Sequence, residues 1–285
     1  KEIYKYKLFN ITFTIDFECF GLIKSNDDPQ LKIIENSKLE KISKNDIYHT
    51  LDTKKSSIEG KGFTSRINKG ECIEYNFFDN QISNYLKQIK ILHQCLPSAL
   101  FQNEMHVIHG CAFAYNNKAV VLAGPSGAGK SETLNILKED FEIISDDIVG
   151  VSNIENKMTC YPGLPFLCVK QDHAEMMLND KRKRSLKIIN ANQMAKNIYE
   201  IGQILFLEWG NFNTIEKVSS INGFKNLLAN SFRPLPSMSD NFSEEIFVKN
   251  LSCITSSSNQ FIFKRKKGDI NKSVNFLKVI LKDIT

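Results

Sequence analysis

The chain has 285 residues, of which 42% are hydrophobic and 24% charged, so it is long enough to bury one large core or two smaller ones. No apolar run approaches the roughly 20 residues that cross a bilayer, and no signal-peptide core follows the charged N-terminus. We therefore expect a cytoplasmic protein without a membrane partner. The net charge of +5 is mild and suits a protein that handles anionic phosphates, but it does not require one.

The first part of the chain is expected to be mainly β. Runs of aromatic and β-branched residues with partial alternation predict three strands, at Tyr4–Phe13, Phe13–Phe20 and Leu31–Ile34. A further pair of strands, Thr64–Ile67 and Glu71–Phe78, is predicted to be joined by a turn at Asn68–Gly70.

The hydrophobic period becomes helical over residues 82–102, where leucine and isoleucine recur every three or four positions. Asp79 is the expected N-cap of this helix, and Pro97 is expected to interrupt it. The change of period predicts a β-rich N-terminal region at residues 1–80 and a second domain at residues 81–285.

A strand pair and a glycine-rich loop come next. Cys111–Tyr115 is predicted to pair with Ala119–Ala123 through a turn of asparagines, and the second of these strands runs directly into the loop. Beyond the loop we expect a helix at Glu132–Lys138 and a buried strand at Phe141–Ser145.

The remaining chain mixes the two kinds of element. The predicted elements are a helix at Asn190–Ile198, a strand at Gln203–Glu208, a helix at Ile221–Leu228, a strand at Gln260–Lys264 and a helix at Lys272–Leu281. Alternation of strands and helices predicts an α/β protein.

The loop itself matches a phosphate-binding pattern, which is a glycine, four residues and then Gly-Lys-Ser. The motif lies between an apolar strand and a helix, where backbone N–H groups and the helix N-terminus can bind phosphate oxygens. Lys130 is expected to neutralise charge on the β- and γ-phosphates, and the Ser131 hydroxyl to ligate Mg²⁺. The sequence therefore predicts ATP and Mg²⁺ as ligands, without distinguishing ATP from GTP. The residues expected to bind them are Gly124, Pro125, Ser126, Gly127, Ala128, Gly129, Lys130, Ser131 and Glu132.

Two adjacent carboxylates, Asp146 and Asp147, end the apolar strand that follows the loop helix. An acid at the end of such a strand can hold Mg²⁺ or its water, and a second can take the proton of an acceptor hydroxyl. His109 precedes the predicted hairpin, which would bring it back beside the phosphates. We prefer it to His106, which is followed by two apolar residues.

The segment from His109 to Asp147 resembles the C-terminal catalytic domain of HPr serine kinase/phosphorylase. The resemblance depends on His-Gly before the hairpin, on Gly-Lys-Ser-Glu ending at Glu132, and on an apolar strand that ends in Asp-Asp. Broader relatives with the phosphoenolpyruvate carboxykinase type of fold include kinase-like proteins encoded with lasso-peptide precursors. The order of a β-rich region, a helix and then His109 is closer to those relatives. The resemblance implies an α/β fold with mixed sheets around a P-loop kinase core.

The same resemblance implies roles for the site residues. Lys130 would bind phosphate, and Ser131 and Asp147 would hold the metal. Asp146 would be the base for the hydroxyl of an acceptor serine. Asp147 and His109 would orient the reacting groups or support them electrostatically.

Two features of the family are missing from this sequence. Tyr161–Lys170 contains no acidic residue where the family carries a metal-binding glutamate, which puts a second metal site and the reverse, phosphorolytic reaction in doubt. A later signature with glycines and an arginine is also missing, so HPr is not the expected substrate. Arg233 is the residue that we consider as a replacement for that arginine.

The leading hypothesis is an ATP-dependent kinase that phosphorylates a hydroxyl, typically of serine, on a peptide or small protein, as a lasso-peptide tailoring kinase would. A kinase of a free amino acid or sugar, and a nucleotide-binding switch or scaffold without acceptor turnover, remain open. The basic run Lys181–Arg184 is too short to predict nucleic-acid binding. The sequence allows a homo-oligomer but does not specify one.

Overall fold

The computed structural model shows a mixed α/β protein with several sheets. The described residues are 2–44, 48–170, 176–177, 184–231, 237–238 and 244–284. The chain divides into two compact units, one of Lys1–Val107 with Phe232–Phe247 and one of Ile108–Ser231 with Val248–Thr285. Among the described helices, none is both long enough and apolar enough to cross a bilayer.

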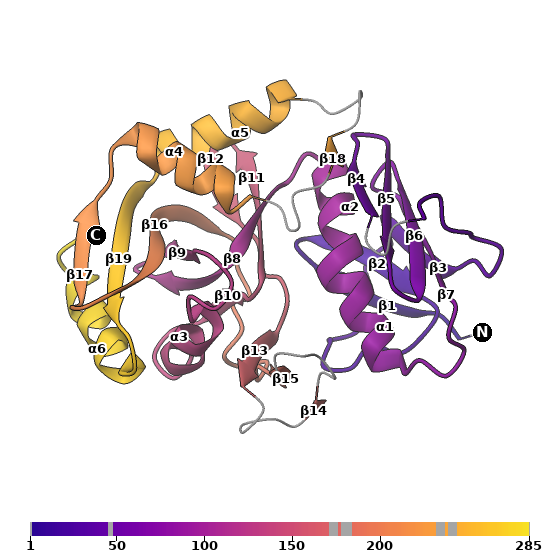
Figure 1. The fold of residues 1–285 in the computed structure, drawn as a ribbon, viewed down its shortest axis with the longest axis horizontal. Helices are drawn as coiled ribbons and strands as arrows, with labels where there is room; N and C mark the ends of the chain where they lie inside the picture. The colour runs from indigo at the N-terminus through magenta and orange to yellow at the C-terminus, as the bar shows by residue number, and fades with distance from the viewer. Residues whose placement is uncertain are drawn as a thin grey trace. The chain divides into compact units, whose positions relative to one another are not determined.

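The first unit contains an eight-stranded mixed sheet (Figure 1). In sheet order its strands are β1 (Tyr4–Leu8), β2 (Ile11–Ile15), β3 (Leu31–Glu35), β7 (Cys72–Phe77), β6 (Phe63–Asn68), β5 (Lys55–Gly60), β4 (Tyr48–Leu51) and β18 (Ser237–Met238). β3 pairs in parallel with β2 and β7, and the β6–β7 pair is antiparallel. The predicted strand at Leu31–Ile34 and the predicted pairing across Asn68–Gly70 are confirmed.

The beginning of the sheet differs from the expectation. Instead of two long strands over residues 4–20, β1 and β2 form a hairpin whose turn is Phe9 and Asn10, both with left-handed φ angles of 53° and 60°. Phe9 is a rare residue in this conformation, and its side chain is fully buried. Burial of that ring explains why the chain turns where no glycine marks a turn.

The helical segment of the first unit continues through Pro97. Its parts are α1 (Asn84–Lys90), the π-helical turn η1 (Ile91–Cys95) and α2 (Leu96–Gln102). Pro97 lies in the first turn of α2, directly after the π-helical turn that ends at Cys95, and the helical segment runs through it, so the expected interruption is absent. The N-cap is Ser83, whose side chain accepts from the Leu86 N–H, and not Asp79.

Hydrogen bonds tie this helical segment to the first unit. The Gln88 side chain accepts from the Phe20 N–H at 2.7 Å and donates to the Phe20 carbonyl at 2.9 Å. The Gln102 amide donates to the carbonyl of Ile67 on β6 at 3.3 Å. The first unit therefore extends to Val107, which differs from the boundary expected after residue 80.

The second unit contains another eight-stranded mixed sheet. Along its main path the strands are β10 (Ile143–Ser145), β8 (His106–Tyr115), β11 (Ile148–Ile154), β12 (Lys157–Cys160), β16 (Tyr199–Gly210), β19 (Asn259–Lys266) and β17 (Thr214–Lys217). β9 (Lys118–Ala123) pairs antiparallel with β8 and parallel with β16. β16 also pairs in parallel with β19. The predicted strands at Ala119–Ala123, Gln203–Glu208 and Gln260–Lys264 are confirmed.

Helices cover both faces of this second sheet (Figure 1). They are α3 (Lys130–Leu137), α4 (Ser220–Ala229), α5 (Glu244–Ser257) and α6 (Ile270–Ile280). Leu134 of α3 and Leu277 of α6 share one core with Leu205 of β16 and Phe263 of β19. The predicted helices at Ile221–Leu228 and Lys272–Leu281 are confirmed. Because side chains alternate along a strand, odd-numbered residues of β16 and β19 face α3 and α6.

A three-stranded sheet completes the described structure, with β15 (Arg184–Ile188) between β13 (Phe166–Lys170) and β14 (Met176–Met177). The helix predicted at Asn190–Ile198 is wrong. The chain there forms turns, because its backbone pairs with the edge strand β10: the Ile143 N–H donates to the Gln193 carbonyl and the Ala195 N–H to the Ile143 carbonyl, both at 2.8 Å. Lys181–Lys183 of the basic run, and Arg233, lie outside the described residues.

Candidate functional site

The glycine loop follows a central, fully covered strand. β9 lies between β8 and β16, and its residues Ala119–Ala123 are buried. The loop leaves the carboxyl end of β9 and enters α3, whose N-cap is Gly129. Glycine has no side chain to cap the first turn of that helix. The strand, the loop and the helix are therefore arranged as the sequence predicted, with the helix N-terminus at the loop.

Three loop glycines have backbone conformations that other residues adopt only with strain. Their φ angles are 148° at Gly124, 84° at Gly127 and 77° at Gly129. A Cβ on Gly124 would lie 2.9 Å from the Leu207 carbonyl oxygen, so the loop also passes very close to β16. Such turns direct successive N–H groups into one concavity, which favours an anion.

Lys130 folds back over the loop. Its ammonium group donates to the carbonyl of Gly124 at 2.6 Å and to that of Pro125 at 3.1 Å, and the residue is only 8% exposed. A positive charge is thus held at the loop, with Ser126 and Gly127 exposed beside it. An anion bound in this concavity would meet that charge at short range.

Ser131 contacts Asp146, which follows β10. The hydroxyl donates to Asp146 Oδ1 at 3.0 Å, and Asp146 Oδ2 accepts from the Cys168 N–H at 3.1 Å. Asp146 is 1% exposed. Burial, with the neighbouring charge of Asp147, raises its pKa to about 6 against the opposing effect of these hydrogen bonds. A buried carboxylate held against a loop serine is a suitable ligand for a hard divalent cation.

Asp147 and His109 form a second contact beside the first. His109 Nδ1 lies 3.1 Å from the carbonyl oxygen of Asp147 and 3.6 Å from its Oδ1. The Asp147 side chain is 32% exposed, whereas that of His109 is 10% exposed. Asp147 also has a left-handed φ of 66°, a conformation found at functional sites. The rejected alternative, His106, is buried against Phe247, and burial lowers its pKa to about 3.

Two residues beside the loop were not identified from the sequence. Arg265, on β19, is fully buried and donates to the hydroxyl of Thr133 on α3 at 2.6 Å. Its NH2 group would lie 3.1 Å from a Cβ on Gly129, so its charge lies against the loop. Burial lowers its pKa to about 10, and it remains charged at neutral pH. Trp209, on β16, donates from its indole N–H to the Gly127 carbonyl at 3.3 Å.

The structure thus brings together the loop residues, both aspartates and His109, all within the second unit. Glu132 lies in the first turn of α3, and the charge of its carboxylate raises the pKa of Arg265, against the larger effect of burial. Tyr161–Lys170, which lacks an acid, supplies the backbone N–H of Cys168 to Asp146 instead. Arg265 and Thr133 form a hydrogen bond although they are 132 residues apart in the sequence. No local sequence pattern could have predicted that Arg265 lies at the loop.

The oxygen atoms of Ser131 and Asp146 suit a cation that also binds substrate oxygens. No group of three or more His, Cys, Asp or Glu side chains that could hold a metal occurs among the described residues. The oxygens of Ser131 and Asp146 are hard ligands of the kind that Mg²⁺ takes together with water and phosphate. These residues fit Mg²⁺ bound with a nucleotide better than a metal held by protein alone.

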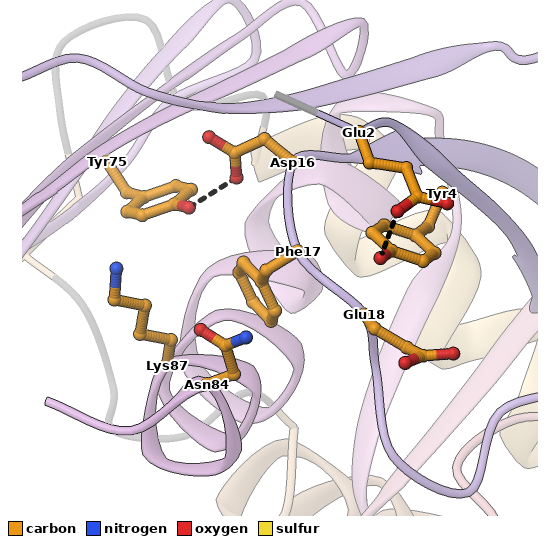
Figure 2. Close-up of a pocket in the computed structure, with 8 residues that line it drawn as sticks. All are labelled: Glu2, Tyr4, Asp16, Phe17, Glu18, Tyr75, Asn84 and Lys87. Carbon is orange, nitrogen blue, oxygen red and sulfur yellow. Dashed lines mark hydrogen bonds between the residues drawn. The ribbon is translucent and has the colours of Figure 1, made fainter.

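A separate pocket of about 390 Å³ lies in the first unit (Figure 2). Its lining includes three carboxylates, Glu2, Asp16 and Glu18, and one ammonium group, that of Lys87. The Tyr75 hydroxyl donates to Asp16 Oδ1 at 2.5 Å. This charge balance is the opposite of what a phosphate site needs, so the glycine loop and this pocket are different features.

Comparison with known proteins finds a structural match but no sequence match. No protein-family model matches the sequence, and no curated protein matches it. The chain is structurally similar to the Hpr(Ser) kinase/phosphatase from Coxiella burnetii, with a TM-score of 0.34 and 10% sequence identity. That match covers 62% of this chain and 93% of the other. The geometry of the loop and its neighbours, rather than this likeness, is the basis for a functional proposal.

Proposed function

We propose that the protein is an ATP-dependent kinase that transfers the γ-phosphate to a hydroxyl, typically of serine, on a peptide or small protein. The observation that supports it most is the bond between Ser131, at the end of a glycine loop, and the buried Asp146. Simple nucleotide binding does not need a second carboxylate and a histidine beside this pair, whereas transfer to an acceptor does. We also infer that the second unit is a P-loop kinase core of the HPr-kinase type.

The loop binds the triphosphate in this proposal. Backbone N–H groups of Gly124–Ser131 and the N-terminus of α3 hold its oxygens. Lys130 leaves the two carbonyls that it contacts and neutralises charge on the β- and γ-phosphates. Arg265 adds a second positive charge behind the loop, in a buried place where solvent screens it little.

The sequence predicted Asp146 as the base and Asp147 as a metal ligand, and the contacts favour the reverse assignment. Asp146 uses one oxygen on Ser131 and the other on the Cys168 N–H, so it is suited to hold Mg²⁺ together with Ser131. Bound Mg²⁺ would supply charge neutralisation to the phosphate oxygens. Asp147, the more exposed carboxylate, is accessible to an acceptor and becomes the proposed base.

The proposed reaction is an in-line displacement. The acceptor oxygen forms a bond to the γ-phosphorus while the bond from that phosphorus to the bridging oxygen breaks, which leaves ADP. Asp147 takes the proton of the acceptor hydroxyl. His109, which contacts Asp147, orients that carboxylate.

Incubation of the protein with ATP, Mg²⁺ and serine-containing peptides tests the proposal, with phosphate addition measured by mass spectrometry. We expect one phosphate on the peptide and an equal amount of ADP. Lys130→Met should abolish transfer. Tight ATP binding with no transfer to peptides, free serine or sugars would contradict a kinase and favour a nucleotide switch. Transfer to free serine alone would contradict the peptide acceptor.

A further inference from the structure

Trp209 and Arg265 lie side by side at the ends of neighbouring parallel strands. They are paired residues in the register of β16 with β19. Both are odd-numbered positions and so face the same side of the sheet as Leu205 and Phe263, which pack under α3 and α6. The next position along that face of β16, beyond Leu207, is Trp209, where the strand reaches the level of the phosphate loop.

One face of the Trp209 ring is covered by Arg265. The guanidinium carbon lies 4.7 Å from the ring centroid, in the geometry of a cation–π contact. Arg265 is itself fully buried and anchored to Thr133. Its Nε and second terminal nitrogen have no hydrogen-bond acceptor among the described residues, so the indole face is a major partner of this charge. The arginine therefore fixes the plane of the ring from behind.

Part of the Trp209 side chain is open to solvent. The residue is 42% exposed although it is large, aromatic and located beside a buried core. Its indole N–H is bonded to the Gly127 carbonyl, so the ring is fixed to the loop as well as to Arg265. An aromatic ring that is held in place by a contact on one face and is partly exposed to solvent can stack a planar base.

We propose that the exposed face of Trp209 stacks against the nucleobase of the nucleotide whose phosphates the loop binds. This inference rests on the proposed function, because the loop must first hold the phosphates. The link through Gly127 positions the ring at the loop edge, where a ribose and base joined to the bound phosphates can reach it. The stack would bind a base by its π-face, and so adds affinity for nucleotides over inorganic polyphosphates.

Trp209 is the only tryptophan of the chain, so its fluorescence reports on this ring alone. Wild-type protein is titrated with ADP and, separately, with inorganic tripolyphosphate, both with Mg²⁺. We expect ADP to quench the fluorescence and tripolyphosphate to bind with little quenching. By calorimetry, Trp209→Ala should weaken ADP binding by about 10-fold, since one stacked base contributes about 1–3 kcal/mol. Tripolyphosphate binding should not change.

Trp209→Phe keeps an aromatic face but lacks the N–H that bonds to Gly127, and it should retain most of the ADP affinity. An equal loss of ADP and tripolyphosphate binding in Trp209→Ala would overturn the inference, because the ring would then only support the loop. So would unchanged ADP affinity in that variant. If wild-type protein binds neither ligand, the proposed function itself fails; if it binds both without a difference in quenching, only the base platform fails.

Discussion

The hydroxyl of Ser131 donates a 3.0 Å hydrogen bond to Asp146, and this bond joins the end of the glycine loop to the residue that follows β10. The two residues are 15 positions apart in the sequence. Asp146 accepts a second hydrogen bond from the Cys168 N–H. The fold thus holds a loop hydroxyl and a buried carboxylate together.

Removal of either partner should weaken the Mg²⁺-dependent part of nucleotide binding. In wild-type protein we expect Mg²⁺ to increase ADP affinity. Ser131→Ala and Asp146→Asn should each lose about 10-fold or more of that increase, because the first removes an oxygen ligand and the second removes the negative charge of the carboxylate. Calorimetric titration with ADP, with and without Mg²⁺, measures this effect. Ser152→Ala is the control, since its hydroxyl bonds to that of Tyr161, away from the loop. Variants that keep the full Mg²⁺ effect would exclude this pair as the metal site.

Asp147→Asn should slow phosphate transfer and leave nucleotide affinity nearly unchanged. The variant keeps the size of the side chain but cannot take the proton of the acceptor, and loss of a general base costs about 100-fold or more in rate. His109→Asn should give a smaller decrease, because it acts through Asp147. Transfer rates measured with saturating ATP separate the two effects. Two results together would contradict the proposal: Asp147→Asn transfers phosphate at the wild-type rate, and Asp146→Asn binds Mg²⁺ normally but transfers none. Asp146 would then be the base, as the sequence predicted.

The ionisation of Asp146 should make the ligand-free protein less stable as the pH rises. Its pKa in the fold, about 6, lies above the ordinary 3.8, so the folded state holds the proton more tightly and stability falls between these values. Asp146→Asn removes the cost of the buried charge. Above about pH 6 the variant should gain about 3 kcal/mol in unfolding free energy, and at about pH 4 the gain should nearly vanish. Urea unfolding across this range, without Mg²⁺, measures it. A pH-independent loss of stability would contradict the prediction.

Alanine should be tolerated differently at two glycines of the loop. Gly124→Ala places a Cβ 2.9 Å from the Leu207 carbonyl, a backbone atom that cannot easily move, in addition to a φ of 148°. At Gly127 the φ is 84° but no atom lies within 4 Å of the added Cβ. We expect Gly127→Ala to cost about 1 kcal/mol, the cost of a left-handed residue, and Gly124→Ala about 1–3 kcal/mol more. Thermal and urea unfolding compare the variants. Equal costs would mean that the loop moves freely away from β16.

Local patterns were sufficient to predict the strand, loop and helix of the site. The apolar run of β9 and the spacing from Gly124 to Ser131 are continuous in sequence, and each carries its own signal. The same holds for the β6–β7 hairpin, whose turn contains Gly70. The turn at Phe9 carried no such signal, because a buried ring rather than a glycine determines it.

Tertiary contacts account for what the sequence could not predict. The segment at Asn190–Ile198 has a helical pattern, but the unpaired edge of β10 offers it backbone hydrogen bonds instead. Pro97 was expected to break a helix, but the helical segment runs through it, because a π turn ends at Cys95 and α2 begins at Leu96. Arg265 reaches the loop only because β19 pairs with β16, which lies next to β9. Residue spacing in the sequence cannot predict a contact that depends on the order of strands in the sheet.

The most direct test of the central claim is a titration of wild-type protein and Lys130→Met with ADP in the presence of Mg²⁺. Lys130 supplies the loop ammonium group, and its loss should decrease affinity by about 100-fold, since it would pair with phosphate charge in a buried site. Lys138→Met, at the other end of α3, is the matched control and should bind as wild type does. Failure of the folded wild-type protein to bind ADP, or equal binding by Lys130→Met, would contradict the claim that this loop binds a nucleotide.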